Sequence, residues 1–163
     1  MTPRVEQLIA EIQSLGEVFE WYAPATEASI AALEQAFGVR LPPSYRAFLA
    51  RYGGGGIQAY DGISGIWNNN PLTLNLGTAY GDTMRMRAER GMPDHLIVIA
   101  RGDEHFPPMC LDTSRPGPEE EYPIVAYFLM SRRISTDSYA NFTEYFEDDL
   151  ANSLEAIRET LPE

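Results

Sequence analysis

Apolar residues recur at helical spacing in several stretches of the chain, and each stretch carries recognisable end signals. The first predicted helix covers residues 4–15, with Thr2 as a possible N-cap and Gly16 after its end. Its apolar face consists of Val5, Leu8, Ile9, Ile12 and Leu15. A second helix is expected to begin after Thr26 and to end at Gly38.

Three more helices follow from the same reasoning. A short helix begins near Pro43 and ends with Tyr52, and another is expected over residues 78–90. The closing helix has Asn141 as its cap and Glu144 in the capping-box position. Its apolar stripe contains Phe142, Tyr145, Phe146, Leu150, Leu154 and Ile157.

Between the third and fourth helices, and again after the fourth, the period changes toward two, which is typical of strands. Inward positions are predicted in the first of these regions for Ile57, Ala59, Ile63, Ile66, Leu72, Leu74 and Leu76. The second region predicts strands over 96–101, 109–113 and 123–129, and the aromatic segment 19–22 is expected to be a linker folded over the core. Strands that follow one another without intervening helices favour antiparallel pairing, so we expect an α+β fold with a single mainly antiparallel sheet flanked by N-terminal and C-terminal helices.

Four consecutive glycines, residues 53–56, resemble a phosphate-binding loop at first sight. A phosphate loop continues into Gly-Lys-Ser/Thr and lies between a strand and a helix. This run follows a helix and lacks that continuation, so phosphate binding is not expected here.

The size and the charge of the chain exclude several classes of function. A chain of 163 residues fits one domain, 1–163, and the lone Cys110 excludes an internal disulfide and a multi-cysteine zinc site. The net charge of -12 argues against direct binding of nucleic acid and favours a partner protein with a basic surface. With no apolar run long enough for a membrane span and no export signal, we expect a cytoplasmic protein without membrane contact or cofactor.

The segment 30–55, which reads IAALEQAFGVRLPPSYRAFLARYGGG, carries a more specific signal. It resembles the N-terminal signature of the SUKH superfamily, which includes the yeast cell-wall assembly regulator and many bacterial immunity proteins. The similarity extends over about residues 26–150. It implies an α+β fold and, in bacterial members, neutralisation of a polymorphic toxin, often a nuclease or deaminase, by direct binding. A regulatory protein-binding module without a toxin is the alternative that the yeast relative implies.

Candidate catalytic groups are sparse. Asp103, Glu104 and His105 form the nearest approach to a catalytic or metal cluster, and His95 precedes them by ten residues. No His-x₃-His or Cys-x₂-Cys pair accompanies them, and Cys110 alternates with apolar neighbours as a core residue does. We therefore expect no enzyme, no catalytic residues and no metal; a small hydrolase using the 103–105 cluster is the least favoured alternative.

The residues expected to contact a partner lie in predicted loops and acidic runs. Trp67 stands beside three asparagines and a proline, where it suits either a binding hot spot or the core under a loop. Acidic runs solubilise a surface more often than they dock a partner. The expected partner-binding residues are Asp61, Trp67, Asn69, Asp103, Glu104, Glu119, Glu120 and Glu121.

Overall fold

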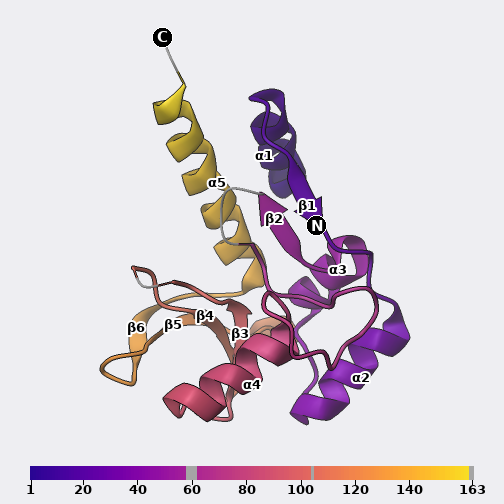
Figure 1. Ribbon diagram of the computed structural model, residues 1–163, viewed down its shortest axis with the longest axis vertical. Helices are drawn as coiled ribbons and strands as arrows, with labels where there is room; N and C mark the ends of the chain where they lie inside the picture. The colour runs from indigo at the N-terminus through magenta and orange to yellow at the C-terminus, as the bar shows by residue number, and fades with distance from the viewer. Residues whose placement is uncertain (58–61, 104, 162–163) are drawn as a thin grey trace.

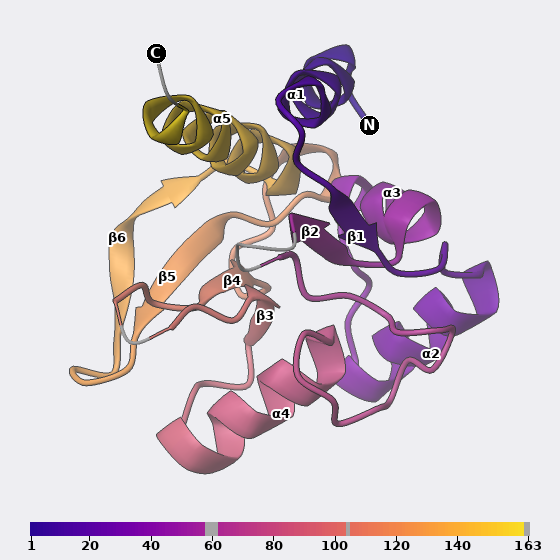
Figure 2. The ribbon, with the colours of Figure 1, turned by 45° about the horizontal axis from the view of Figure 1, so that its top comes forward.

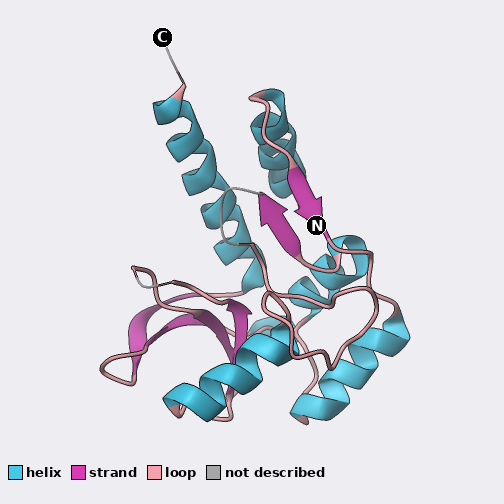
Figure 3. Ribbon diagram, viewed as in Figure 1, coloured by secondary structure: helices cyan, strands magenta, loops and turns pink. Residues whose placement is uncertain are grey.

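The computed structural model of the protein describes residues 1–57, 62–103 and 105–161 (Figure 1). Helices and strands alternate irregularly along the chain, and the two antiparallel sheets occupy different parts of the molecule (Figure 3). The elements are α1 Pro3–Ser14, β1 Phe19–Trp21, α2 Glu27–Phe37, α3 Pro43–Tyr52, β2 Gly55–Ile57, α4 Ala79–Arg90, β3 Leu96–Ala100, β4 Met109–Asp112, the 3-10 turn η1 Pro118–Glu120, β5 Ile124–Phe128, β6 Arg133–Tyr139 and α5 Phe142–Thr160. The expected α+β class is confirmed.

The predicted helices form because their ends are satisfied locally. Four helices have an N-cap side chain that accepts a backbone N–H from the first turn. These N-caps are Thr2, Thr26, Thr78 and Asn141. Gly38 and Gly91 adopt left-handed conformations, with φ of 70° and 64°, directly after α2 and α4. These caps fix the helix bounds close to the predicted ones.

The larger sheet has the strand order β3-β4-β5-β6, and every neighbouring pair is antiparallel. Successive residues of β3 point to opposite faces, so Ile97 and Ile99 enter the main core while Leu96 and Val98 enter a second cluster. The main core lies against α1, α2, α3 and α5. Figure 2 shows α5 crossing over one side of the sheet and α4 lying next to β3.

The smaller sheet joins β1 to β2, and the segment 63–65 connects it to the larger one. Gly55 and Ile63 exchange two backbone hydrogen bonds of 2.9 Å, and the Ser64 N–H donates to the Ile99 carbonyl of β3 at 2.8 Å. On the other side of this segment, the Gly65 N–H donates to the Gly77 carbonyl. The order across this region is therefore β1, β2, segment 63–65, β3.

One strand prediction is wrong, and two strands were not predicted. Leu72, Leu74 and Leu76 are not inward-facing: they lie in a loop and are 47%, 64% and 54% exposed. The segment 19–22 is not a plain linker, because Phe19–Trp21 forms β1. The strand β6 was not anticipated, since its sequence RISTDSY is polar and it lies at the sheet edge.

Candidate protein-binding surface

The loop between Trp67 and Leu76 carries large apolar side chains into solvent. Trp67 is 44% exposed, and the three leucines of this loop are about as exposed or more so. The whole segment 62–81 contains no charged residue, in a chain of which 22% is charged. Four exposed large apolar side chains on one uncharged loop make this loop the foremost candidate for contact with another molecule.

Polar contacts hold this loop in place at both ends. Asn68 and Asn69 adopt left-handed conformations, with φ of 47° and 55°, in the turn after Trp67. The Asn69 side chain accepts the Thr26 N–H at 2.8 Å, which ties the turn to the start of α2. At the far end, the Thr78 hydroxyl donates to the Asn75 carbonyl at 2.7 Å. The exposed apolar side chains are therefore presented by a fixed backbone.

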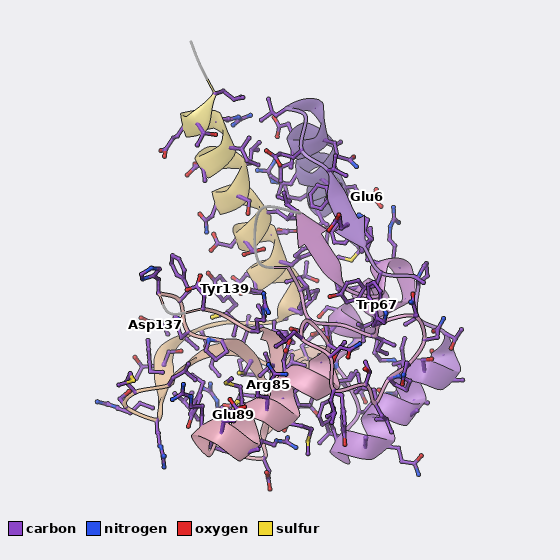
Figure 4. All side chains as sticks on the ribbon, in the orientation of Figure 1. Glu6, Trp67, Arg85, Glu89, Asp137 and Tyr139 are labelled. Atoms are coloured by element: carbon purple, nitrogen blue, oxygen red, sulfur yellow. The ribbon has the colours of Figure 1, made fainter. Side chains whose placement is uncertain are left out.

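A hollow of about 590 Å³ opens beside the loop. Trp67 and Tyr22 form an edge-to-face pair there, with ring centroids 4.9 Å apart and planes at 82°. The Tyr22 hydroxyl donates to the Gly77 carbonyl at 3.0 Å, and Leu76 lines the same side. Figure 4 shows Trp67 near β1 and β2. This end of the hollow is apolar and aromatic.

The floor of the hollow is bare backbone because glycines occupy it. Gly56 lies opposite Glu20 in the β1–β2 pair, and a Cβ on Gly56 would lie only 2.8 Å from the Cα of Gly62. Side chains alternate along β1, so Trp21 packs inward on Tyr52 while Glu20 lies on the face of the hollow. The glycines therefore let the segments 55–57 and 62–65 approach each other closely, and backbone atoms line this part of the hollow.

A second hollow, of about 390 Å³, adjoins the first and shares Leu76 and Arg101 with it. It is also lined by Asp82, Arg85 and Asp103. Figure 4 shows Arg85 on α4. The two hollows adjoin at Leu76 and Arg101, and together they are called the depression.

Asp82 is the buried charge of this region, only 2% exposed. Burial raises the pKa of its carboxyl group, while hydrogen bonds from the Ser64 hydroxyl at 2.7 Å and the Gly77 N–H at 3.2 Å favour the ionised form. The charges of Arg101 and Arg85 also favour the ionised form. Asp82 therefore ties α4 to the segments under the loop.

Three of the predicted partner-binding residues lie in or beside this depression. Trp67 is in the first hollow, and Asp103 is in the second. Asn69 belongs to the loop, where its side chain serves the turn. The Asp103 carboxylate accepts the N–H groups of His105 and Phe106, which lower its pKa and close a local turn.

The predicted acidic run 119–121 lies outside both hollows, and its third residue has a structural role. Glu119 and Glu120 are exposed in η1, with left-handed φ values of 58° and 61°. The Glu121 carboxylate accepts the Ser44 N–H at 2.9 Å and the Ser44 hydroxyl at 2.7 Å. It caps α3, whose own N-cap, Pro42, has no side-chain acceptor. The remaining two predicted residues, Asp61 and Glu104, lie outside the described residues.

The two histidines considered for chemistry lie at opposite ends of a strand. His95 precedes β3 and His105 follows it, so a strand about 16 Å long stands between them. Cys110 is fully buried in the second cluster, where burial raises its thiol pKa. Within residues 1–57, 62–103 and 105–161, no three His, Cys, Asp or Glu side chains are grouped so as to hold a metal ion.

Sequence reasoning missed several residues of the depression. Glu20 and Tyr22 were assigned to a linker, and the exposed leucines of the loop were assigned to strands. The available signal was the absence of charged residues throughout 62–81. It was accompanied by asparagine and proline before the alternating leucines and by glycine after them. Nothing in the sequence pattern marked Arg101, which enters the site because it follows β3.

Comparison with known families places the chain. The family model SUKH_5, described as SMI1-KNR4 cell-wall, matches residues 5–151. The chain belongs to this family. A search of curated proteins gave no match. In the part of this SUKH_5 member that the structure describes, no helix combines the length and the apolar character that crossing a bilayer requires.

Proposed function

We propose that this SUKH_5 member is an immunity-type protein, which binds a cognate toxin domain and neutralises it by covering its working surface. It acts stoichiometrically in the cytoplasm, transforms no substrate and needs no cofactor. Membership of a family known to include immunity proteins and regulators supports this assignment.

The exposed, uncharged loop 67–76 is the observation that carries the proposal. The central part of a protein interface is depleted of charged residues and enriched in aromatic ones, whereas its rim is polar. Trp67 and the exposed leucines have that central character, and Glu20, Arg101 and Asp103 line the hollows next to them. An interface of the usual size buries about 800 Å² on each partner, so the contact extends well beyond the loop.

The charge of the chain supports a basic partner. The chain contains twenty-four acidic and twelve basic residues. Toxins that act on nucleic acids carry basic surfaces that bind their substrate. Opposite charge raises association rates from about 10⁵–10⁶ to as much as 10⁸–10⁹ M⁻¹s⁻¹ at low salt. A nuclease or deaminase domain is the kind of toxin that fits this charge. We expect its association to slow as salt is added.

The test is co-expression with the product of the gene directly upstream, followed by co-purification. A toxin domain there should be tolerated only with this protein present and should elute with it as a complex. Leu74→Glu should weaken the complex at least tenfold, because it places a charge in the apolar centre of the contact. Met130→Glu is the matched control, since Met130 is 94% exposed on the β5–β6 turn and lies outside both hollows.

Two results would refute the assignment. If the neighbouring product is not toxic and forms no complex, the protein is not its immunity partner. A stable complex with a non-toxic protein would instead support the regulatory module implied by the yeast relative. Equal losses of binding for Leu74→Glu and Met130→Glu would contradict the placement of the contact at the loop.

A further inference from the structure

The unmatched charge in the first hollow is that of Glu20. Its carboxylate lies at the β1 side of the hollow and makes no ion pair or hydrogen bond with the described part of the chain. Asp82, the other acidic group nearby, has hydrogen bonds from Ser64 and Gly77 and two neighbouring guanidinium groups. Among the residues that the structure describes, no cation pairs with the Glu20 carboxylate of the hollow.

Arg101 is the only basic residue that lines this hollow among the described residues. The strand order places it across the floor from Glu20, with β2 and the segment 63–65 between them. At about 4.8 Å for each strand, the two side chains start about 14 Å apart. The positive charge of Arg101 favours the ionised forms of Asp82 and of the Tyr22 hydroxyl, which lie at the other side of the hollow from Glu20.

The walls and floor of the hollow suit a flat cation. Trp67 and Tyr22 present aromatic rings, and Gly56 and Gly62 leave a floor without side chains. A guanidinium group is planar, stacks on aromatic rings and pairs with a carboxylate through two N–H groups, whereas an ammonium group is compact and more strongly hydrated. A volume of about 590 Å³ accommodates one long side chain with its flanking backbone.

We propose that this hollow receives an arginine side chain of the partner protein, with its guanidinium paired to Glu20 and its stem against Trp67 and Leu76. This inference rests on the proposed function, because it names the group through which a basic partner is held. The net charge of -12 supports a cationic occupant over an anionic one.

The test uses short peptides, so it does not depend on finding the toxin. The ¹⁵N-labelled protein is titrated with acetyl-Gly-Arg-Gly-amide and with the matched peptides carrying Leu or Glu in place of Arg. The arginine peptide should shift the Trp67 indole signal and the backbone amides of Gly56 and Gly77 at millimolar concentration. Added salt should weaken this binding.

Two variants and a control identify the contacts. Glu20→Gln should weaken binding of the arginine peptide about fivefold, the loss expected for one exposed ion pair. Trp67→Ala removes the wall against which the arginine stem packs, and should weaken binding two- to fivefold. Glu155→Gln removes an exposed charge from α5, away from the hollow, and should change nothing.

Three outcomes would overturn the proposal. They are equal or tighter binding of the leucine peptide, preferential binding of the glutamate peptide, and no saturable shift with the arginine peptide. Any of these leaves the toxin complex to be judged by co-purification. Conversely, a peptide response of the expected kind without a toxin complex would retain the arginine site and refute the immunity function.

Discussion

Asp149 on α5 is a carboxylate that the fold places in an unfavourable position. It is half-buried and lines a cavity of about 20 Å³ together with Phe19, Ile63 and Leu150. Burial, and then the adjacent charge of Asp148, raise its pKa from 3.8 to about 6. Replacing Asp149 with asparagine removes the charge while nearly keeping the shape of the side chain.

The size and sign of the effect follow from linkage. Because the folded state holds the proton more tightly, the protein loses stability as pH rises from the unfolded pKa near 4 to the folded pKa of about 6. A difference of about two pKa units corresponds to about 3 kcal/mol once the group is fully ionised in both states. The asparagine amide is also polar and half-buried, so we expect Asp149→Asn to gain about 1–3 kcal/mol near pH 8. Below the unfolded value near 4 the gain should vanish.

Urea unfolding at a series of pH values measures this difference directly. The variant and the wild type should have nearly the same free energy of unfolding near pH 4, should diverge between pH 4 and about 6, and should keep a constant gap above that. Glu155→Gln on the same helix is the control, because it is exposed and should show no pH-dependent gap. A gain for Asp149→Asn that persists unchanged at pH 4, or no gain near pH 8, would refute the electrostatic reasoning.

Two further predictions concern contacts that stabilise the fold. Glu121→Ala removes the acceptor for the Ser44 N–H and should cost about 0.5–2 kcal/mol in chemical unfolding, whereas an unchanged midpoint would show that this cap contributes nothing. Gly65→Ala would place a Cβ 1.9 Å from the Gly53 carbonyl oxygen and should prevent cooperative folding, as judged by circular dichroism. Gly117→Ala is its control, since there the nearest atom is 3.3 Å away, and equal stability of the two variants would contradict the close-packing argument.

Helices were predictable because their signals are local. Thr26 caps α2 through a contact three residues away, and Gly38 ends it, so the sequence alone contains both bounds. The strands β3 and β5 were predictable because each is a short run of apolar residues buried on both faces. In the same way, the signature over residues 30–55 indicated the family that the comparison confirmed.

The candidate surface was less predictable because long-range contacts create it. Alternation of leucine with polar residues over 72–76 reads as a half-buried strand, yet neighbouring strand positions beside β3 are already occupied by the segment 63–65. The acidic run 119–121 reads as a solvated face, and its third residue instead caps a helix 77 positions earlier in the chain. Neither outcome follows from spacing within a short window.

The polar contacts that fix the loop 67–76 have a consequence for how this protein changes over generations. Not one side chain between Trp67 and Leu76 is buried, so substitutions there leave the core intact, provided that the turn at Asn69 is kept. The glycines beneath, by contrast, accept no added atom without a clash. Substitution of a few exposed residues can therefore change what the loop binds, with little effect on the free energy of unfolding.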